Sequence, residues 1–258
     1  MISLTHAFPG GSAVVTGGAS GLGLAAALAL TGAGLSVSVL DLPQACERLD
    51  AGEGLFSIPA DVTDAASVEA AFAKHEAQSG ACRVHVNCAG VIGAGMMFAR
   101  ENPLTGDAFR RVIDVNLIGS FNCARAAALQ MKAADPTDDG ARGIIINTSS
   151  IAAYDGMIGQ TAYAASKGAI ASMTLPMARE LAHYGIRVMT IAPGVFSTPM
   201  IHNLPGQSRD MVSSMLPVFP QRLGEPDEFG LLVLSIIANP LLNGEVIRLD
   251  GGLRMPPR

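Results

Sequence analysis

The feature that most constrains the fold of this chain is an alternation of short apolar runs with longer helical segments. The apolar runs cover residues 12–17, 35–41, 54–61, 83–90, 142–150, 186–194 and 244–252. The helical patterns cover 21–34, 63–80, 105–134, 161–183 and 226–239. Strands connected through helices pair in parallel, and helices then cover both faces of the sheet. We therefore expect an α/β fold in which residues 1–258 form one doubly wound domain with about seven parallel strands.

The charge pattern argues against several classes of partner. The 258 residues carry a formal net charge of -5 and contain no run of Lys or Arg, which argues against nucleic acid and against an anionic membrane surface. Residues 1–40 contain no Asp, Glu, Lys or Arg, but Pro9 and several glycines interrupt them before they reach the ~18 apolar residues of a membrane span. They also lack a basic leader segment, so we expect no membrane partner and a cytoplasmic location.

The cysteines support the same location. The four residues, Cys46, Cys82, Cys88 and Cys123, form no CxxC pair and no metal-ligand spacing with a histidine. Reduced, buried thiols of a cytosolic protein are the plain interpretation, and we expect no metal site.

A glycine-rich loop, TGGASGLG at 16–23, joins the first predicted strand to the first predicted helix. Gly17, Gly21 and Gly23 permit a tight turn and let backbone N–H groups approach a pyrophosphate, while the helix N-terminus adds a partial positive charge. Plain strand–helix turns also carry such glycines, so the loop alone indicates a nucleotide site only weakly.

An aspartate at the end of the second strand strengthens this interpretation. Asp41 follows Gly23 by 18 residues, where a carboxylate can accept hydrogen bonds from both ribose hydroxyls of adenosine. It would repel a 2′-phosphate, and neither Ser20 nor Leu42 supplies a compensating positive charge, so NAD is favoured over NADP. The alternative is an ordinary turn residue before Pro43.

Tyr163 and Lys167 in the sequence YAASK lie four residues apart, so they share one face of a predicted helix. An ammonium about 4 Å from the phenol would contribute about 4 kcal/mol at an effective dielectric near 20, enough to lower the pKa of Tyr163 by about three units. The spacing therefore predicts a tyrosine that acts as an acid or base at neutral pH. Ser150, at the carboxyl end of a strand, is the expected partner, with Ser149 as its rival.

Together, TGGASGLG, NCAG (87–90), DVN (114–116), Ser150, YAASK and APG (192–194) resemble the short-chain dehydrogenase/reductase family over nearly the whole chain. The resemblance implies a Rossmann-like fold, a homotetramer and a catalytic set of Asn116, Ser150, Tyr163 and Lys167. Asn116 would hold a water in a proton relay; taken alone, it reads as a polar helix residue. Substrate would contact Ser150, Gln160 and Tyr163. The expected cofactor contacts are Gly17, Ser20, Gly21, Leu22, Gly23, Asp41, Asp61, Val62, Cys88, Ala89, Gly90, Tyr163, Lys167, Pro193, Phe196 and Thr198.

Within that family, LDLP (40–43), ADVT (60–63) and NPLLNGEVIRLDGGLRM (239–255) resemble the type 2 3-hydroxyacyl-CoA dehydrogenase subfamily. The resemblance implies NAD-dependent oxidation of a 3-hydroxyacyl-CoA. Better-known animal members carry a lysine-containing loop after NCAG, whereas segment 91–109 here has Arg100 as its only basic residue. The alternatives are a dehydrogenase of another apolar secondary alcohol or steroid and, more remotely, a non-catalytic NAD-binding scaffold.

Residues 195–221 are expected to form the substrate loop. Its apolar residues, which suit an acyl chain or a ring system, are Met200, Leu204, Met211, Met215, Leu216, Val218 and Phe219. The alternative is ordinary packing of an interface helix. His183 and His202 are expected to be surface or core residues, because the catalytic set already accounts for proton transfer.

Overall fold

A computed structural model describes residues 8, 11–49, 52–99, 103–203, 206, 212 and 214–257 of the chain. Its core is a seven-stranded sheet in the order β3-β2-β1-β4-β5-β6-β7, with every neighbouring pair parallel. The strands are β1 (Ser12–Thr16), β2 (Ser36–Asp41), β3 (Leu55–Pro59), β4 (Cys82–Asn87), β5 (Gly143–Thr148), β6 (Ile186–Pro193) and β7 (Val246–Leu249). The predicted α/β class and parallel sheet are therefore confirmed.

Helices connect the strands. The α-helices are α1 (Gly21–Gly32), α2 (Pro43–Cys46), α3 (Ala65–Ser79), α4 (Gly106–Ile113), α5 (Gly119–Ala133), α6 (Thr161–Leu181), α7 (Pro199–His202) and α9 (Pro226–Ala238). The described residues also form the π-helix η1 (Asp114–Ile118) and the 3-10 helices η2 (Ile151–Ala153) and η3 (Ala182–Tyr184). Sequence signals account for several ends. The Asp64 carboxylate caps α3 by accepting from the Ala66 N–H at 2.9 Å, for example.

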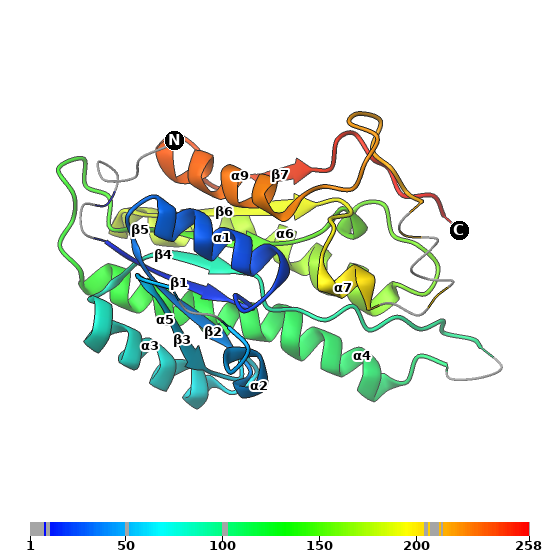
Figure 1. Cartoon of the computed structure of the whole chain (residues 1–258), viewed down its shortest axis with the longest axis horizontal. Helices are drawn as coiled ribbons and strands as arrows, with labels where there is room; N and C mark the ends of the chain where they lie inside the picture. The colour runs from blue at the N-terminus through cyan, green and yellow to red at the C-terminus, as the bar shows by residue number, and fades with distance from the viewer. Residues whose placement is uncertain are drawn as a thin grey trace.

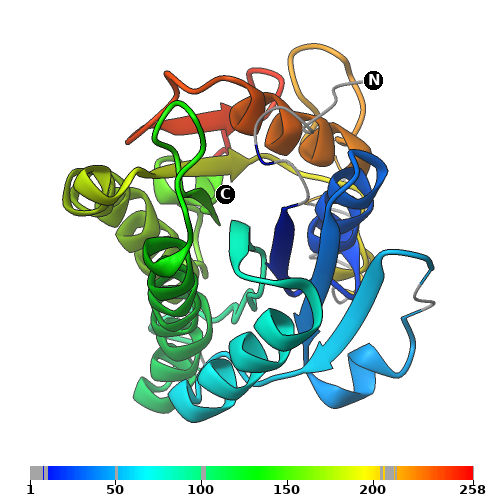
Figure 2. The ribbon, with the colours of Figure 1, turned by 90° about the vertical axis from the view of Figure 1, so that its left-hand side faces the viewer.

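The two faces of the sheet bury different helices, as Figures 1 and 2 show. Successive side chains of a strand point to opposite faces. Ala13 and Val15 therefore pack in the cluster that includes α1 and α9, whereas Val14 packs in the cluster that includes α3 and α5. Gly230 lets α9 approach α1 closely, because a Cβ there would lie 2.8 Å from the Ala25 carbonyl oxygen.

One predicted element is wrong in detail. Residues 105–134 are not a single regular helix, because the five-residue π-helix η1 separates α4 from α5. Asn116 lies within η1 and is fully buried. π-Helical turns inside α-helices often occur at functional sites.

The strand order places a crevice beside the glycine loop. The chain moves outward from β1 to β2 and β3, then returns to β4 on the other side of β1. In doubly wound sheets, ligands bind at the carboxyl ends of the strands on either side of such a reversal. Among the described helices, none has the length and apolar character needed to cross a membrane.

Candidate active site

A cavity of about 890 Å³ opens at the carboxyl ends of the central strands. It brings together residues that are distant in sequence, from the glycine loop to the segment after β6. The sequence-predicted residues that line it are Gly17, Ser20, Gly21, Leu22, Gly23, Asp41, Asp61, Val62, Cys88, Ala89, Gly90, Ser150, Gln160, Tyr163, Lys167, Pro193, Phe196 and Thr198. Of the predicted site residues, Asn116 alone is absent from this wall.

The glycine loop forms a cradle that side chains would fill. Gly17 has a φ of +61°, and a Cβ there would lie 2.7 Å from the Ala89 backbone nitrogen. A Cβ on Gly23 would lie 2.2 Å from the Gly17 carbonyl oxygen. This bare backbone, at the start of α1, fits the close approach of a dinucleotide pyrophosphate.

Asp41 lies at the end of β2 with its carboxylate fixed by two backbone donors. The N–H of Ala19 donates to Oδ2 at 3.1 Å, and the N–H of Leu42 donates to Oδ1 at 2.8 Å. The first bond ties the carboxylate to the glycine loop. Since a carboxylate offers about four lone-pair sites, acceptor capacity remains for ribose hydroxyls.

Asp61 and Val62 follow β3, the strand next to β2, and also line the cavity. The Asp61 Oδ1 accepts from both the backbone N–H (2.9 Å) and the hydroxyl (2.8 Å) of Thr63, which sets the turn into α3. Val62 packs closely on Gly119, where a Cβ would lie 2.6 Å from a Val62 methyl group.

Tyr163 and Lys167 face the cavity from one side of α6, but their electrostatics differ from the prediction. The Lys167 Nζ donates to the Thr148 carbonyl oxygen at 2.8 Å and lies 5.8 Å from the Tyr163 ring centroid. Burial raises the pKa of Tyr163, and a hydrogen bond from Ser150 offsets only part of that effect. The expectation that Lys167 lowers this pKa is therefore wrong for the chain without ligands. Burial also lowers the pKa of Lys167 to about 8.

The two candidate serines have different surroundings. Ser149 is buried and its hydroxyl donates to the Lys167 carbonyl oxygen at 2.7 Å, so it braces the helix backbone. Ser150 caps η2 by accepting from the Ala152 N–H at 3.1 Å, and it hydrogen-bonds Tyr163. This arrangement favours Ser150 over Ser149 as the partner of the tyrosine.

The Asn116 carboxamide makes its hydrogen bonds within the chain. Its Oδ1 accepts from the Val91 N–H at 2.8 Å, and its Nδ2 donates to the Val91 carbonyl at 2.9 Å and to the Ser166 hydroxyl at 3.0 Å. The side chain therefore joins the segment after β4 to helix α6. The proton-relay role stays a prediction.

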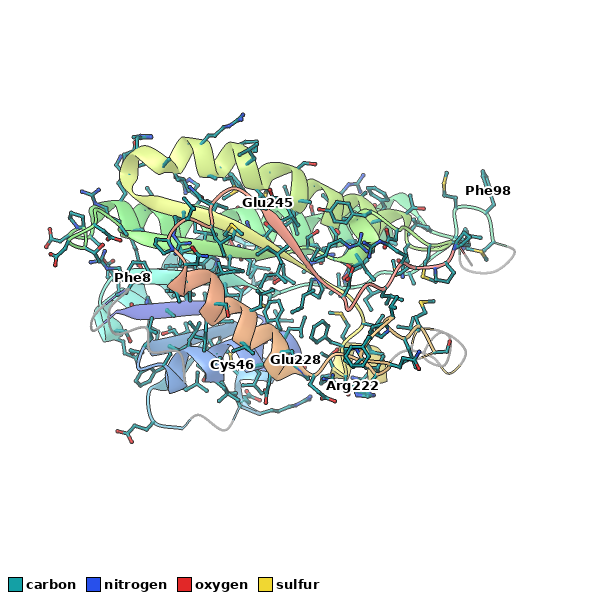
Figure 3. The ribbon with its side chains drawn as sticks, turned by 90° about the horizontal axis from the view of Figure 1, so that it is seen from above. Phe8, Cys46, Phe98, Arg222, Glu228 and Glu245 are labelled. Carbon is teal, nitrogen blue, oxygen red and sulfur yellow. The ribbon has the colours of Figure 1, made fainter. Side chains whose placement is uncertain are left out.

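The substrate side of the cavity is mainly apolar. Met200 and Met215 of the predicted loop line it, whereas Leu216, Val218 and Phe219 do not. The Val218 and Phe219 side chains are exposed, and their backbone N–H groups donate to the Gly251 carbonyl oxygen. Leu204 and Met211 lie outside the described residues. Directly after the predicted loop, Arg222 forms an ion pair with Glu228 of α9 at 2.8 Å. The two side chains lie next to each other in Figure 3.

Sequence reasoning missed several cavity residues. Met157 and Met255 add to the apolar wall, and Arg111 adds an exposed cation. Met255 follows the last strand, and no periodic pattern in the sequence indicates that this segment lies at the site. The predicted Arg100 lies outside the described residues. Phe98 is 91% exposed at the edge of the molecule (Figure 3).

The remaining histidines and acids form no second centre in the described part of the chain. His183 stacks on Tyr184 with ring centroids 3.8 Å apart, and the His202 ring lies 3.1 Å from the Ser197 hydroxyl. Neither lines the cavity. Within the described residues, no group of three or more His, Cys, Asp or Glu side chains is arranged to hold a metal ion.

Comparison with known proteins agrees with this geometry. A family model described as short chain dehydrogenase matches residues 12–208. The human 3-hydroxyacyl-CoA dehydrogenase type-2 is 50% identical over 95% of both chains. The Drosophila melanogaster protein of that name is 48% identical over 95% of this chain and 97% of its own. The crystal structure of 3-hydroxyacyl-CoA dehydrogenase type-2 from Mycobacterium avium superposes with a TM-score of 0.87, at 39% identity, covering 98% of this chain and 99% of that one.

Proposed function

Because this chain belongs to the short-chain dehydrogenase family, whose members oxidise CH–OH groups or reduce the corresponding carbonyl groups with a nicotinamide cofactor, we propose that it is an NAD-dependent 3-hydroxyacyl-CoA dehydrogenase. One observation carries the proposal: the Tyr163, Ser150 and Lys167 side chains line the same cavity as the glycine cradle and Asp41. The names of the most similar relatives and the apolar substrate side support the choice of substrate.

The cofactor would be held along the carboxyl edge of the sheet. The backbone of Gly17 to Gly23 would bind the pyrophosphate, Asp41 the adenosine ribose, and Asp61 and Val62 the adenine. Cys88, Ala89, Gly90, Pro193, Phe196 and Thr198 would complete the contacts. Bound there, oxidised nicotinamide supplies a hydride acceptor and a positive charge.

Tyr163 is the proposed acid and base. In the oxidation direction the ionised Oη takes the proton from the substrate hydroxyl, and in the reverse direction the protonated phenol returns it. Ser150 donates a hydrogen bond that favours the ionised phenol, which opposes the effect of burial. The same hydroxyl is placed to contact the substrate oxygen, and Gln160, whose buried Oε1 has no hydrogen-bond partner among the described residues, is a further substrate contact.

Lys167 and Asn116 are proposed to complete the catalytic set. With a pKa lowered to about 8, Lys167 is close enough to neutrality to exchange a proton during turnover. Asn116 fixes the Val91 segment and α6 relative to each other, and we retain the proposal that this region holds a water in a proton relay.

The negative charge of Asp41 favours NAD over NADP as the cofactor. Among the described cavity residues, the positive side chains are Arg111 and Lys167, and Lys167 is held on the Thr148 carbonyl oxygen. No cation there is paired with Asp41, so a 2′-phosphate beside it would meet uncompensated negative charge.

The experiment that tests this function measures NADH formation from NAD with (S)-3-hydroxybutyryl-CoA. The same assay is run with free 3-hydroxybutyrate and with a panel of apolar secondary alcohols. We expect a kcat/KM at least tenfold higher for the thioester. Turnover of the free alcohols alone would retain the oxidoreductase chemistry and reject the acyl-CoA substrate.

We also propose a homotetramer located in the cytoplasm. Helix α5 exposes Phe121 and Leu129, and α6 exposes Leu175, which are apolar side chains suited to helix packing between subunits. All four cysteines are free, which suits a reducing compartment. Sedimentation equilibrium tests the homotetramer, and a monomer would contradict it. Cell fractionation tests the cytoplasmic location, and secretion of the protein would contradict it.

A further inference from the structure

Arg248 of β7 lies at the centre of a charge cluster beside the substrate side of the cavity. Its Nη2 donates to the Asp155 Oδ2 at 2.5 Å and its Nη1 to Oδ1 at 3.3 Å, while its Nε donates to the Asp250 Oδ2 at 2.7 Å. The Nη2 also donates to the Leu253 carbonyl oxygen at 3.1 Å. The Arg248, Asp155 and Asp250 side chains are only 22%, 14% and 7% exposed, so water screens these bonds weakly.

Through Asp155, this cluster reaches the partner of the catalytic tyrosine. The Asp155 N–H donates to the Ile151 carbonyl oxygen at 2.9 Å, which closes the turn containing η2. Ser150 caps the other end of that short helix. The Arg248 guanidinium also lies 5.3 Å from the ring centroid of Tyr154, the residue before Asp155. A displacement of Asp155 is therefore transmitted over one tight turn to the Ser150 hydroxyl.

On its other side, the cluster fixes the segment after β7. The Leu253 N–H donates to the Asp250 carbonyl at 3.0 Å, and the Leu253 side chain packs with Ile151 and Met157. Met255 follows and lines the cavity, and the Ile158 N–H reaches the Pro257 carbonyl at 3.4 Å. One guanidinium thus joins two walls of the substrate side, one from residues 150–160 and the other from the last strand.

Removal of this guanidinium would leave two carboxylates without their shared cation. Arg254, whose side chain is 61% exposed, contacts Asp250 at 3.2 Å and is only a minor cause of the lowered pKa of Asp155, so it would compensate each carboxylate only in part. Two poorly solvated carboxylates repel each other, and each regains hydration by moving outward. Both movements separate the walls that carry Ser150 and Met255.

We propose that Arg248 is a positioning residue for the reaction, which holds Ser150 at Tyr163 and the C-terminal wall against the substrate by bridging Asp155 and Asp250. This inference rests on the proposed dehydrogenase function. Arg248 itself does not line the cavity, so its effect on turnover is indirect.

Arg187 provides a matched control, because it is another arginine that makes many bonds within the fold. Its guanidinium donates to the carbonyl oxygens of Ile236, Ile237, Asn239 and Leu242. It lies near the start of β6, at the opposite end of the sheet from the cavity. Loss of Arg187 should therefore lower stability without disturbing the site.

The test compares Arg248→Gln, Arg248→Lys and Arg187→Gln with the wild type. The measured quantities are the denaturation midpoint, the dissociation constant for NADH from fluorescence, and kcat and KM at a temperature where each variant is folded. We expect both glutamine variants to lose stability. Arg248→Gln should also lose at least tenfold in kcat with NADH affinity within threefold of wild type, and Arg248→Lys should recover part of that loss. Arg187→Gln should keep its kcat.

Several results would overturn the inference. Equal kcat for Arg248→Gln and wild type would leave Arg248 as a purely stabilising residue, and so would equal kcat losses in Arg248→Gln and Arg187→Gln. If Arg248→Gln does not fold, Asp155→Asn takes its place, and its kcat must fall at least threefold. Absence of wild-type turnover with every secondary alcohol would instead contradict the proposed function itself.

Discussion

The Lys167 ammonium lies 5.8 Å from the Tyr163 ring centroid, and its hydrogen bond goes to a backbone carbonyl rather than to the phenol. The two side chains share one face of α6, as their spacing predicts. Burial nevertheless dominates the titration of Tyr163 and raises its pKa. In the chain without ligands, the phenol therefore holds its proton at neutral pH.

This finding predicts the alkaline titration of Tyr163. The tyrosinate absorbance of the wild type minus that of Tyr163→Phe should show one phenol with a pKa above the ordinary value of about 10. The Ser150→Ala variant should move this pKa further upward, because it removes the hydrogen bond that favours the phenolate. Titration of the difference signal below pH ~9 would contradict both statements.

Cofactor choice should depend on the charge of Asp41. Asp41→Asn keeps the shape of the side chain but removes its repulsion of a 2′-phosphate, so the ratio of kcat/KM for NADP to that for NAD should rise about tenfold or more, or about 1.4 kcal/mol. Asp107→Asn is the control, since Asp107 is exposed, pairs with Arg110 at 2.6 Å and does not line the cavity. An unchanged ratio in Asp41→Asn would refute the assignment of Asp41 to the ribose.

Alanine substitutions at two glycines of α1 should have different effects on stability. Gly23→Ala places a Cβ against the Gly17 carbonyl oxygen, so it should cost about 1–3 kcal/mol of unfolding free energy and weaken NADH binding. Gly32→Ala meets nothing within 4 Å and should be neutral or stabilising by up to about 1 kcal/mol, with unchanged binding. Denaturant unfolding and NADH fluorescence measure these effects. Equal effects of the two substitutions on stability and on NADH binding would argue against a pyrophosphate site at the glycine loop.

Acid should destabilise the fold through two buried histidines. Burial lowers the pKa values of His75 and His85 to about 4, whereas the unfolded value is about 6.5. The unfolded chain therefore binds more protons between pH 4 and 6.5, and stability falls as the pH decreases through that window. Between pH 7 and pH 5 each histidine should lower the free energy of unfolding by about 2 kcal/mol. Urea unfolding at the two pH values measures this change. His75→Gln should reduce this dependence, because glutamine keeps polar groups near the Ser12 and Ser38 hydroxyls and does not titrate.

Much of the fold could be predicted from local patterns. The seven apolar runs correspond to the seven strands, and the helical pattern over 63–80 corresponds to α3, with Asp64 and Gly80 at its two ends. The π-helix at Asp114–Ile118 could not be predicted in this way. Asn116 within it bonds to Val91 and Ser166, which are distant in sequence, and helical periodicity carries no information on such tertiary bonds.

The positions of the site residues could be predicted where a motif fixes the backbone. Their pKa values could not, because these depend on burial and on tertiary hydrogen bonds. The glycine loop, Asp41 and the YAASK pair all line one cavity, as their motifs indicate. The pKa of Tyr163 depends on burial and on where the Lys167 ammonium finds its hydrogen bond, and neither follows from a four-residue spacing. The same holds for Met157 and Met255, which reach the cavity through tertiary packing alone.

The central claim is that Tyr163 transfers the proton, and the most direct test measures kcat and NADH affinity for Tyr163→Phe beside the wild type. Phenylalanine keeps the ring and removes only the hydroxyl. The account predicts a fall in kcat of about a hundredfold or more, with an NADH dissociation constant within a few-fold of wild type. A variant that retains turnover would contradict the account.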